Sequence, residues 1–230
     1  MMDGAAGRGH ISNMEGSMTS HWMSHRLRPL SANGEVVVGA YGGHPRGIRT
    51  QHWPRCRVCN AAMCHMAQLD AGPWLDLQGY SRLSVFICHA TGGRCEDWDP
   101  WKGANKVLLQ TVKDDNLYDG PHTVRVYRRV QLTIDPAIDE ARLWRDVKER
   151  GVPPRRVLES LRHDKLGGGP IWLTGEDAPQ CPSEKGPMRL AVQLTTDVVA
   201  FDITRGGMAY VFLDPHDRSE DAGRLLWQGS

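Results

Sequence analysis

The chain carries little net charge and no long apolar run. It has 28 Lys and Arg residues against 27 Asp and Glu residues, for a formal net charge of +1. A chain so nearly neutral has no overall field that attracts nucleic acid or an anionic membrane. No apolar run approaches the roughly 18 to 20 residues that cross a bilayer, and the residues after Met1 lack the order of a secretory signal. We therefore expect a cytoplasmic protein without a membrane partner.

Familiar catalytic and nucleotide-binding motifs are also missing. The sequence contains no G-x-S-x-G, Walker loop, H-E-x-x-H or dinucleotide fingerprint. A thiol catalyst built from Cys88 with His89 or His122 is an alternative, because a cysteine nucleophile needs a nearby histidine. The question of enzymatic activity therefore stays open, and a non-catalytic role is favoured.

The sequence does contain an internal repeat of one pattern. Each matched pair is separated by 125 positions (168 − 43): Gly42 with Gly167, Gly43 with Gly168, Cys56 with Cys181, Met63 with Met188, and Gln68 with Gln193. So large a spacing indicates two copies of one supersecondary unit, each too small to bury its apolar side alone. We expect two pseudo-symmetric halves that pack on each other about a pseudo-two-fold axis.

Local patterns predict an α+β fold that is predominantly β. Val-rich or alternating segments indicate strands at residues 35–40, 83–88, 106–112, 122–134 and 207–213. A helix is expected from the N-cap Asp135, with Pro136 at its first position, to Gly151. A second helix is expected from Pro153 or Pro154 to Lys165, so that two helices introduce the second half.

This pattern divides the chain into four parts. Residues 1–34 are rich in Gly, Ser, Met and His and have no apolar period, which predicts a flexible tail. The first half covers residues 35–110, connecting strands and helices cover 111–165, and the second half covers 166–230.

Four cysteines have the spacing of a zinc site. Cys56 and Cys59 form a C-x2-C pair, and Cys88 and Cys95 follow about 30 residues later, after an apolar strand. Without an export signal, disulfides are not expected. Two loops that each offer two thiolates predict one structural zinc ion held by Cys56, Cys59, Cys88 and Cys95. The alternative is four separate reduced cysteines.

The remaining metal-ligating side chains fit this site less well. His52, His65 and His89 are candidate replacements for a thiolate, although a satisfied or exposed histidine is the commoner case, and Cys64 reads as a small buried residue. In the second half, Glu184 stands where the repeat would place the partner of Cys59. A zinc site is therefore expected in the first half only, and surface loops explain the acidic replacements better than a calcium site does.

The doubled motifs resemble a known family. The matching segments are Lys165 to Trp172 (K-L-G-G-x-P-x-W), Cys56-x2-Cys59-x3-Met63-x4-Gln68-Leu69, and Val85 to Cys88 with the trailing Cys95. These resemble the YwqG-like domain-of-unknown-function family, which is related to the eukaryotic programmed cell death protein two. The resemblance implies the fold and the metal, and its eukaryotic members imply a chaperone role for a small-subunit ribosomal protein. Tyr41 and Glu184 depart from the family pattern, which weakens any inference about a client surface.

The expected function is a non-catalytic, zinc-stabilised module that binds a protein or peptide client, either chaperone-like or immunity-type. Glycine turns let a ligand approach the backbone, although a sharp connection between strands is their commoner role, and glutamine amides can bind a peptide or satisfy their own sheet. The candidate binding residues are Gly42, Gly43, Gln68, Gly167, Gly168, Trp172 and Gln193. The alternative is RNA binding through the arginines of residues 120–165, although interleaved carboxylates favour salt-bridged helix faces.

Overall fold

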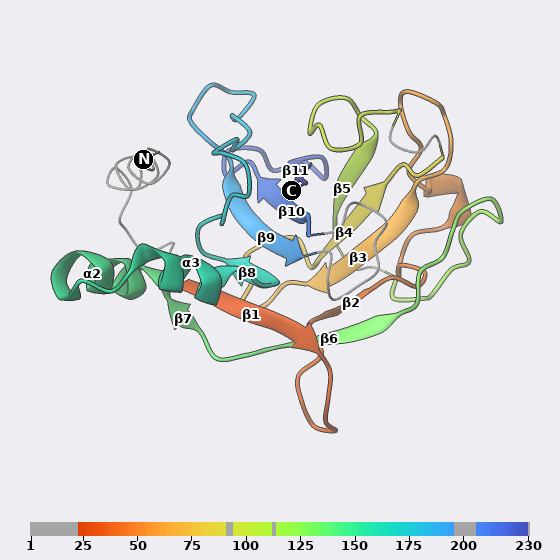
Figure 1. Ribbon diagram of the computed structural model, residues 1–230. Helices are drawn as coiled ribbons and strands as arrows, with labels where there is room; N and C mark the ends of the chain where they lie inside the picture. Colours follow the sequence, from red (N-terminus) through yellow and green to blue (C-terminus); the bar gives the residue numbers. More distant parts are fainter. Residues whose placement is uncertain (1–22, 91–93, 112–113, 196–205, 230) are drawn as a thin grey trace.

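The computed structural model describes residues 23–90, 94–111, 114–195 and 206–229 (Figure 1). These residues form a mostly β protein with two α-helices, which confirms the expected predominantly β character. The helices are α2 (Glu140–Arg150) and α3 (Pro154–Leu161), and a 3-10 turn, η2, spans Thr50–His52. The strands are β1 (Met23–Pro29), β2 (Gly39–Tyr41), β3 (Cys64–Asp70), β4 (Arg82–Ile87), β5 (Asn105–Gln110), β6 (Val130–Ile134), β7 (Ile138–Asp139), β8 (Lys165–Gly167), β9 (Arg189–Thr195), β10 (Met208–Leu213) and β11 (Gly223–Gln228).

All eleven strands belong to one antiparallel sheet. Its order is β11-β10-β9-β8-β1-β6-β2-β3-β4-β5, and β7 pairs with β1 off this path. The strands β1 and β6 therefore lie between two consecutive four-stranded runs, β2 to β5 and β8 to β11 (Figure 1). Sequence neighbours pair within each run, whereas β1 joins the runs by pairing with both β6 and β8.

The sheet curls until its two end strands meet. The backbone N–H of Leu109 in β5 donates to the carbonyl of Glu220 at 3.0 Å, and the Asn105 side chain donates to the carbonyl of Leu225 in β11 at 3.1 Å. Gly223 makes this approach feasible, because a Cβ atom there would lie 2.3 Å from Cγ1 of Val107. The end strands therefore pack against each other at a seam, the β5–β11 seam.

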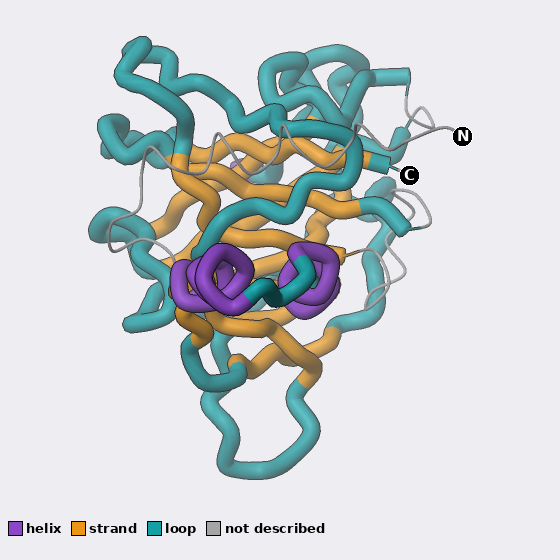
Figure 2. The backbone as a smooth tube through the Cα atoms, turned by 60° about the vertical axis from the view of Figure 1, so that its left-hand side comes forward, coloured by secondary structure: helices purple, strands orange, loops and turns teal. Residues whose placement is uncertain are grey.

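The two helices lie next to each other on one side of the strands (Figure 2). Val157 and Leu161 of α3 are buried in a hydrophobic cluster with Tyr210 and Phe212 of β10. No helix among the described residues combines the length and the apolar composition needed to cross a bilayer.

Helix α2 ends where predicted but begins later. Gly151 closes it in the left-handed conformation at φ 66°, as the sequence predicted. The N-cap is Asp139, whose side chain accepts from the Arg142 N–H at 2.9 Å, and not Asp135. Asp135 is instead held by β1: its carboxylate accepts from Arg28 Nε at 2.8 Å and its N–H donates to the Arg26 carbonyl. Pairing of β7 with β1 thus delays the helix.

The expectation of a tail over residues 1–34 is wrong for its last part. Strand β1 occupies Met23–Pro29, whereas residues 1–22 lie outside the described residues. In β1, Ser24 and Leu27 are buried, a spacing that does not alternate as strand residues usually do. Backbone pairing on both sides holds the strand. Its sequence therefore lacks the alternation of apolar and polar residues that would predict it.

Two predicted strands are shorter than expected. Of residues 122–134, only Val130–Ile134 forms a strand, because residues before it follow the glycine turn instead, where the Gly43 N–H donates to the Tyr127 carbonyl at 2.9 Å. Of residues 35–40, only the end joins β2, and Val36 and Val37 are exposed. The predictions at 83–88 and 207–213 are confirmed by β4 and β10, and that at 106–112 by β5, although Val112 lies outside the described residues.

Candidate metal centre

The four predicted cysteines come from two loops at one end of the first strand run. Cys56 and Cys59 lie between η2 and β3, Cys88 follows β4 directly, and Cys95 lies between β4 and β5. The first loop is closed by backbone bonds from Cys56 N–H to the Ala61 carbonyl and from Asn60 N–H to the Cys56 carbonyl, both 2.9 Å. These bonds hold the C-x2-C segment as a tight turn.

The structure brings the four sulfur atoms together. The Sγ atoms of Cys56, Cys59, Cys88 and Cys95 all lie within 4.8 Å of one another, and those of Cys59 and Cys88 are 3.5 Å apart. A tetrahedral zinc ion with Zn–S bonds of about 2.3 Å separates its sulfurs by about 3.8 Å. The sulfur spacing therefore suits a four-coordinate metal ion such as zinc, and the prediction that these cysteines form one cluster is confirmed.

Apolar side chains surround three of the four cysteines, whereas Cys59 is partly exposed. Cys56, Cys88 and Cys95 are at most 2% exposed and belong to a hydrophobic cluster with Trp53 and Phe86. The Trp53 and Phe86 rings meet edge to face, with 5.5 Å between their centroids. Four thiolate ligands would leave a tetrahedral ion without an open coordination position, which is the arrangement of a structural metal site.

The thiols of the cluster differ in acidity. A backbone hydrogen bond at Ala61 lowers the pKa of Cys59, whereas burial raises the pKa of Cys88. A buried thiolate without a counter-charge is costly, and a coordinating cation removes that cost because it deprotonates the thiols that it binds. The chemistry of the donor set thus suits a thiophilic cation.

The other candidate ligands lie outside the cluster. Cys64 is buried in the main core, as predicted, and burial raises its pKa. The His65 ring bonds to the Gly43 carbonyl at 2.9 Å, the His89 ring to the Tyr127 hydroxyl at 2.7 Å, and His52 is exposed. In the described part of the chain, only the four cysteines form this group.

The two predicted glutamines satisfy backbone groups of the protein itself. Gln68 accepts from the Arg46 N–H at 2.9 Å and donates to the Arg46 carbonyl at 3.0 Å. Gln193 accepts from the Ile171 N–H at 2.9 Å and donates to the carbonyls of Leu161 and His163. Both side chains are buried, so these contacts match the alternative role that the sequence left open for them.

The predicted glycines and Trp172 also contact the protein itself. A Cβ atom would lie 2.4 Å from the Arg128 carbonyl at Gly42 and 2.3 Å from the Glu140 carboxylate at Gly168, and both glycines have positive φ angles. At the remaining turn glycines the Cβ atom would lie 3.0 Å from Cβ of Arg129 at Gly43 and 2.8 Å from the Met23 carbonyl oxygen at Gly167.

Trp172 is partly buried and packs on Tyr210, with 4.8 Å between the ring centroids. The structure brings these predicted residues together within each strand run, not with the cysteine cluster. Their role in ligand binding stays a prediction.

No sequence pattern singles out three basic side chains that lie beside the cysteine loop. Arg57 lies inside the C-x2-C segment, Lys106 in β5 and Arg224 in β11, and all three line one pocket. They come from segments far apart in the sequence, so no local spacing predicts that they lie together. Only the position of Arg57 between two metal-ligand candidates was a signal.

No protein-family model matches this chain, and a comparison with curated proteins finds no match. Membership of the YwqG-like family therefore stays a prediction from the motifs. The four-sulfur cluster and its surroundings carry the functional inference.

Proposed function

We propose that this protein is a non-catalytic module, stabilised by one zinc ion, that binds a protein or peptide partner. The observation that carries the proposal is the group of four sulfur atoms within 4.8 Å of one another, from three buried cysteines and one partly exposed cysteine. An ion with four thiolate ligands has no position for water or substrate, and its contribution is to stabilise the fold around it.

A cysteine-dependent catalytic role has less support. Cys88 belongs to the sulfur cluster, where a bound metal would occupy its thiolate. The neighbouring His89 turns its ring to Tyr127, and the two ring planes are at 90°. Cys88 and one of its two candidate bases, His89, thus have other partners in the structure.

Two related halves are part of the proposal. Hydrogen bonds recur at the 125-residue offset: Cys56 N–H to Ala61 matches Cys181 N–H to Gly186, Met63 N–H to Pro54 matches Met188 N–H to Pro179, and Arg46 N–H to Gln68 matches Ile171 N–H to Gln193. Matching backbone bonds at one offset support two copies of a unit, of which only the first has four cysteines.

A partner surface is available beside the cysteines. Val58, Trp98 and Trp101 are 55%, 44% and 49% exposed, although large apolar side chains are usually buried. Aromatic residues are enriched at protein interfaces. This exposed set supports recognition of a protein next to the metal site.

The described contacts favour a protein partner over RNA. On the helices, Arg150 pairs with Asp146 at 3.3 Å and Arg155 with Glu159 at 2.7 Å, each four residues apart. These pairs offset part of the basic charge on which the RNA alternative depends.

Metal content tests the structural half of the proposal. Protein purified without chelator should hold about one zinc ion per chain by plasma mass spectrometry, and Cys56→Ser with Cys59→Ser should abolish it. The double variant should lose several kcal/mol of unfolding free energy, because metal-binding energy is folding energy. Cys64→Ala and Cys181→Ala are the matched controls and should keep the ion. Zinc-free wild-type protein with unchanged stability would refute the structural role.

Direct binding tests the recognition half. The wild-type chain should retain a defined protein in affinity capture, and that protein, once purified, should bind it with a measurable Kd. Weakening of the same interaction in the Trp98→Ala variant would support the surface beside the cysteines. Retention of RNA alone, with a steep dependence on salt, would contradict the proposal.

A further inference from the structure

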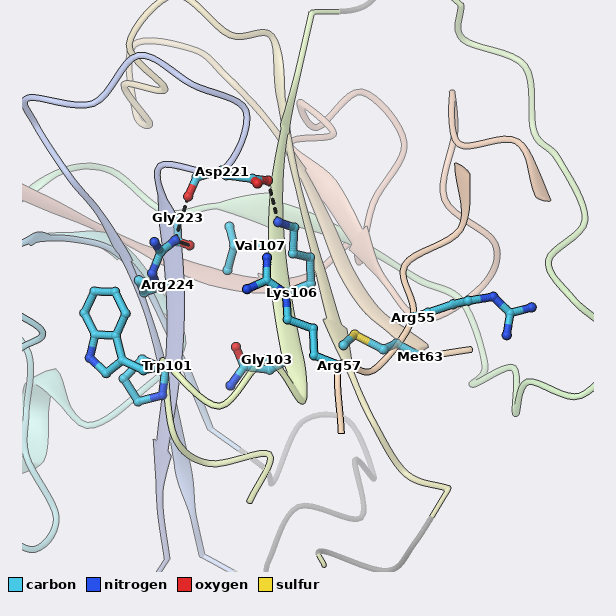
Figure 3. Close-up of a pocket in the computed structure, with 12 residues that line it drawn as sticks. Arg55, Arg57, Met63, Trp101, Gly103, Lys106, Val107, Asp221, Gly223 and Arg224 are labelled. Carbon is cyan, nitrogen blue, oxygen red and sulfur yellow. Dashed lines mark hydrogen bonds and ion pairs between the residues drawn. The ribbon is translucent and has the colours of Figure 1, made fainter. Parts of the chain in front are cut away.

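A small pocket opens at the β5–β11 seam, next to the cysteine loop (Figure 3). Lys106 and Val107 of β5 and Arg224 of β11 line it, together with Arg57 from the C-x2-C turn and Trp101 from the loop before β5. The cavity is about 130 Å³. The pocket thus lies where the metal site of the first strand run faces the last strand of the second.

Positive charge dominates this pocket. Lys106 Nζ and the Asp221 carboxylate form an ion pair. Arg224 donates through Nη1 to the backbone carbonyls of Asp221 and Gly223 at 2.6 and 2.7 Å, and its guanidinium lies 4.8 Å from the Trp101 ring centroid. With Arg55 and Arg57, four cationic side chains therefore line the pocket with one carboxylate, an excess of three positive charges.

Arg57 is the basic side chain of this pocket whose guanidinium has no partner in the part of the chain that the structure describes. Among the described residues, its guanidinium has no hydrogen-bond or ion-pair partner, although its backbone N–H donates to the Gly103 carbonyl at 2.9 Å. In Figure 3 its side chain reaches toward Lys106 and Arg224. The charge of Arg57 also contributes to a lowered pKa of Arg224, after the larger effect of burial. Like charges are thus held together here, and Asp221 offsets only part of them.

We propose that this pocket binds a carboxylate side chain from an acidic segment of the protein partner. The inference rests on the proposed function and names the chemistry of the partner. A guanidinium holds a carboxylate through two parallel hydrogen bonds, and Arg57 has all of its donors available for this. Trp101 and Arg224 form the wall, and tryptophan and arginine are the residue types that most often dominate binding energy at interfaces.

Size and surroundings favour a carboxylate over nucleic acid. A cavity of about 130 Å³ accommodates a side-chain carboxylate but not a base with its sugar. One ring face of Trp101 is already covered by Arg224, and the neighbouring Lys102 pairs with Glu96 at 3.2 Å. The basic side chains therefore form a local cluster, whereas a phosphate backbone needs a continuous track.

The test uses a fluorescein-labelled peptide of ten glutamates and, as its uncharged counterpart, the same peptide with glutamine. Fluorescence anisotropy in about 50 mM salt should show binding of the glutamate peptide only, since exposed charge attraction is little screened there. Arg57→Gln should weaken that binding about tenfold. Arg156→Gln is the matched control, because Arg156 lies exposed on α3 and is not among the residues that line the pocket. It should change the Kd less than about twofold.

Three results would overturn the assignment. They are no binding of the glutamate peptide to the wild-type chain, equal losses in both arginine variants, and Arg57-dependent binding of a single-stranded RNA in place of the peptide. Circular dichroism and zinc content of Arg57→Gln should match the wild type, which separates a binding defect from unfolding. A captured partner protein that binds wild type and Arg57→Gln equally well would refute the pocket but leave the proposed function intact.

Discussion

At the residue scale, a buried histidine ties strand β3 to the first glycine turn. His65 is 3% exposed, and its Nδ1 atom lies 2.9 Å from the Gly43 carbonyl, to which the N–H donates. Burial lowers the pKa of His65 to about 4, helped by the nearby charge of Arg129. The ring is therefore neutral in the folded protein at pH 7, whereas in the unfolded chain it titrates near 6.5.

This shift makes stability depend on pH. Between about pH 6.5 and 4 the unfolded chain binds a proton at His65 that the folded protein does not, so stability falls as the pH falls. At pH 5 the loss from this residue is about 2 kcal/mol. His65→Asn keeps a donor for the Gly43 carbonyl but does not titrate, so its urea-unfolding free energy should fall less between pH 7 and 5. Parallel curves of unfolding free energy against pH for the two proteins would contradict this assignment. Any protonation of the cysteine thiolates at low pH affects both proteins equally and cancels in the comparison.

At the element scale, one buried ion pair joins α2 to β8. Glu140 begins α2 and Lys165 begins β8, both side chains are 0% exposed, and Nζ lies 2.7 Å from Oε1. The same groups bond to the next glycine turn, since Lys165 donates to the Gly169 carbonyl at 2.7 Å and the Gly169 N–H donates to Glu140 at 2.9 Å. The K-L-G-G-x-P motif is thus a structural junction between helix and sheet.

Removing one partner of this ion pair should strongly destabilise the protein. Lys165→Met leaves the Glu140 carboxylate buried without its cation, and we expect a loss of about 3–5 kcal/mol in unfolding free energy by urea titration. Glu140→Gln combined with Lys165→Met removes both charges and should recover part of that loss. If the double variant loses the sum of the two single effects, the side chains do not act as a pair.

At the scale of the whole molecule, contact between the end strands closes the curled sheet. Gly223 lies against Val107, and the Lys106–Asp221 pair and the Leu109–Glu220 backbone bond cross the same seam. Because the two strand runs meet here and at β1, these contacts determine how the runs are placed relative to each other. The proposed carboxylate pocket exists only while the seam is closed.

A side chain at Gly223 should strain the seam. Gly223→Ala would place a methyl group 2.3 Å from Cγ1 of Val107, and overpacking of this kind costs about 1–3 kcal/mol. Val107→Ala in the same chain removes the nearer contact and should restore part of the melting temperature. Zinc content should stay unchanged in both. A Gly223→Ala protein as stable as the wild type would show that the end strands separate freely.

Local patterns in the sequence were enough to predict several features of the structure. The spacing of Cys56, Cys59, Cys88 and Cys95 anticipated their cluster, the apolar runs anticipated β4 and β10, and Gly151 marked the end of α2. Each of these depends on a few neighbouring residues: chelate spacing, strand propensity and the left-handed freedom of glycine.

Features that no local pattern predicts depend on partners distant in sequence. Strand β1 exists because β6 and β8 complete its backbone hydrogen bonds, and α2 starts late because Asp135 is engaged by Arg28. The basic pocket unites Arg57 with Arg224, and the fold alone places them together. Local spacing does not predict backbone pairing or charge clustering. Both depend on which distant segments the closed sheet brings into contact.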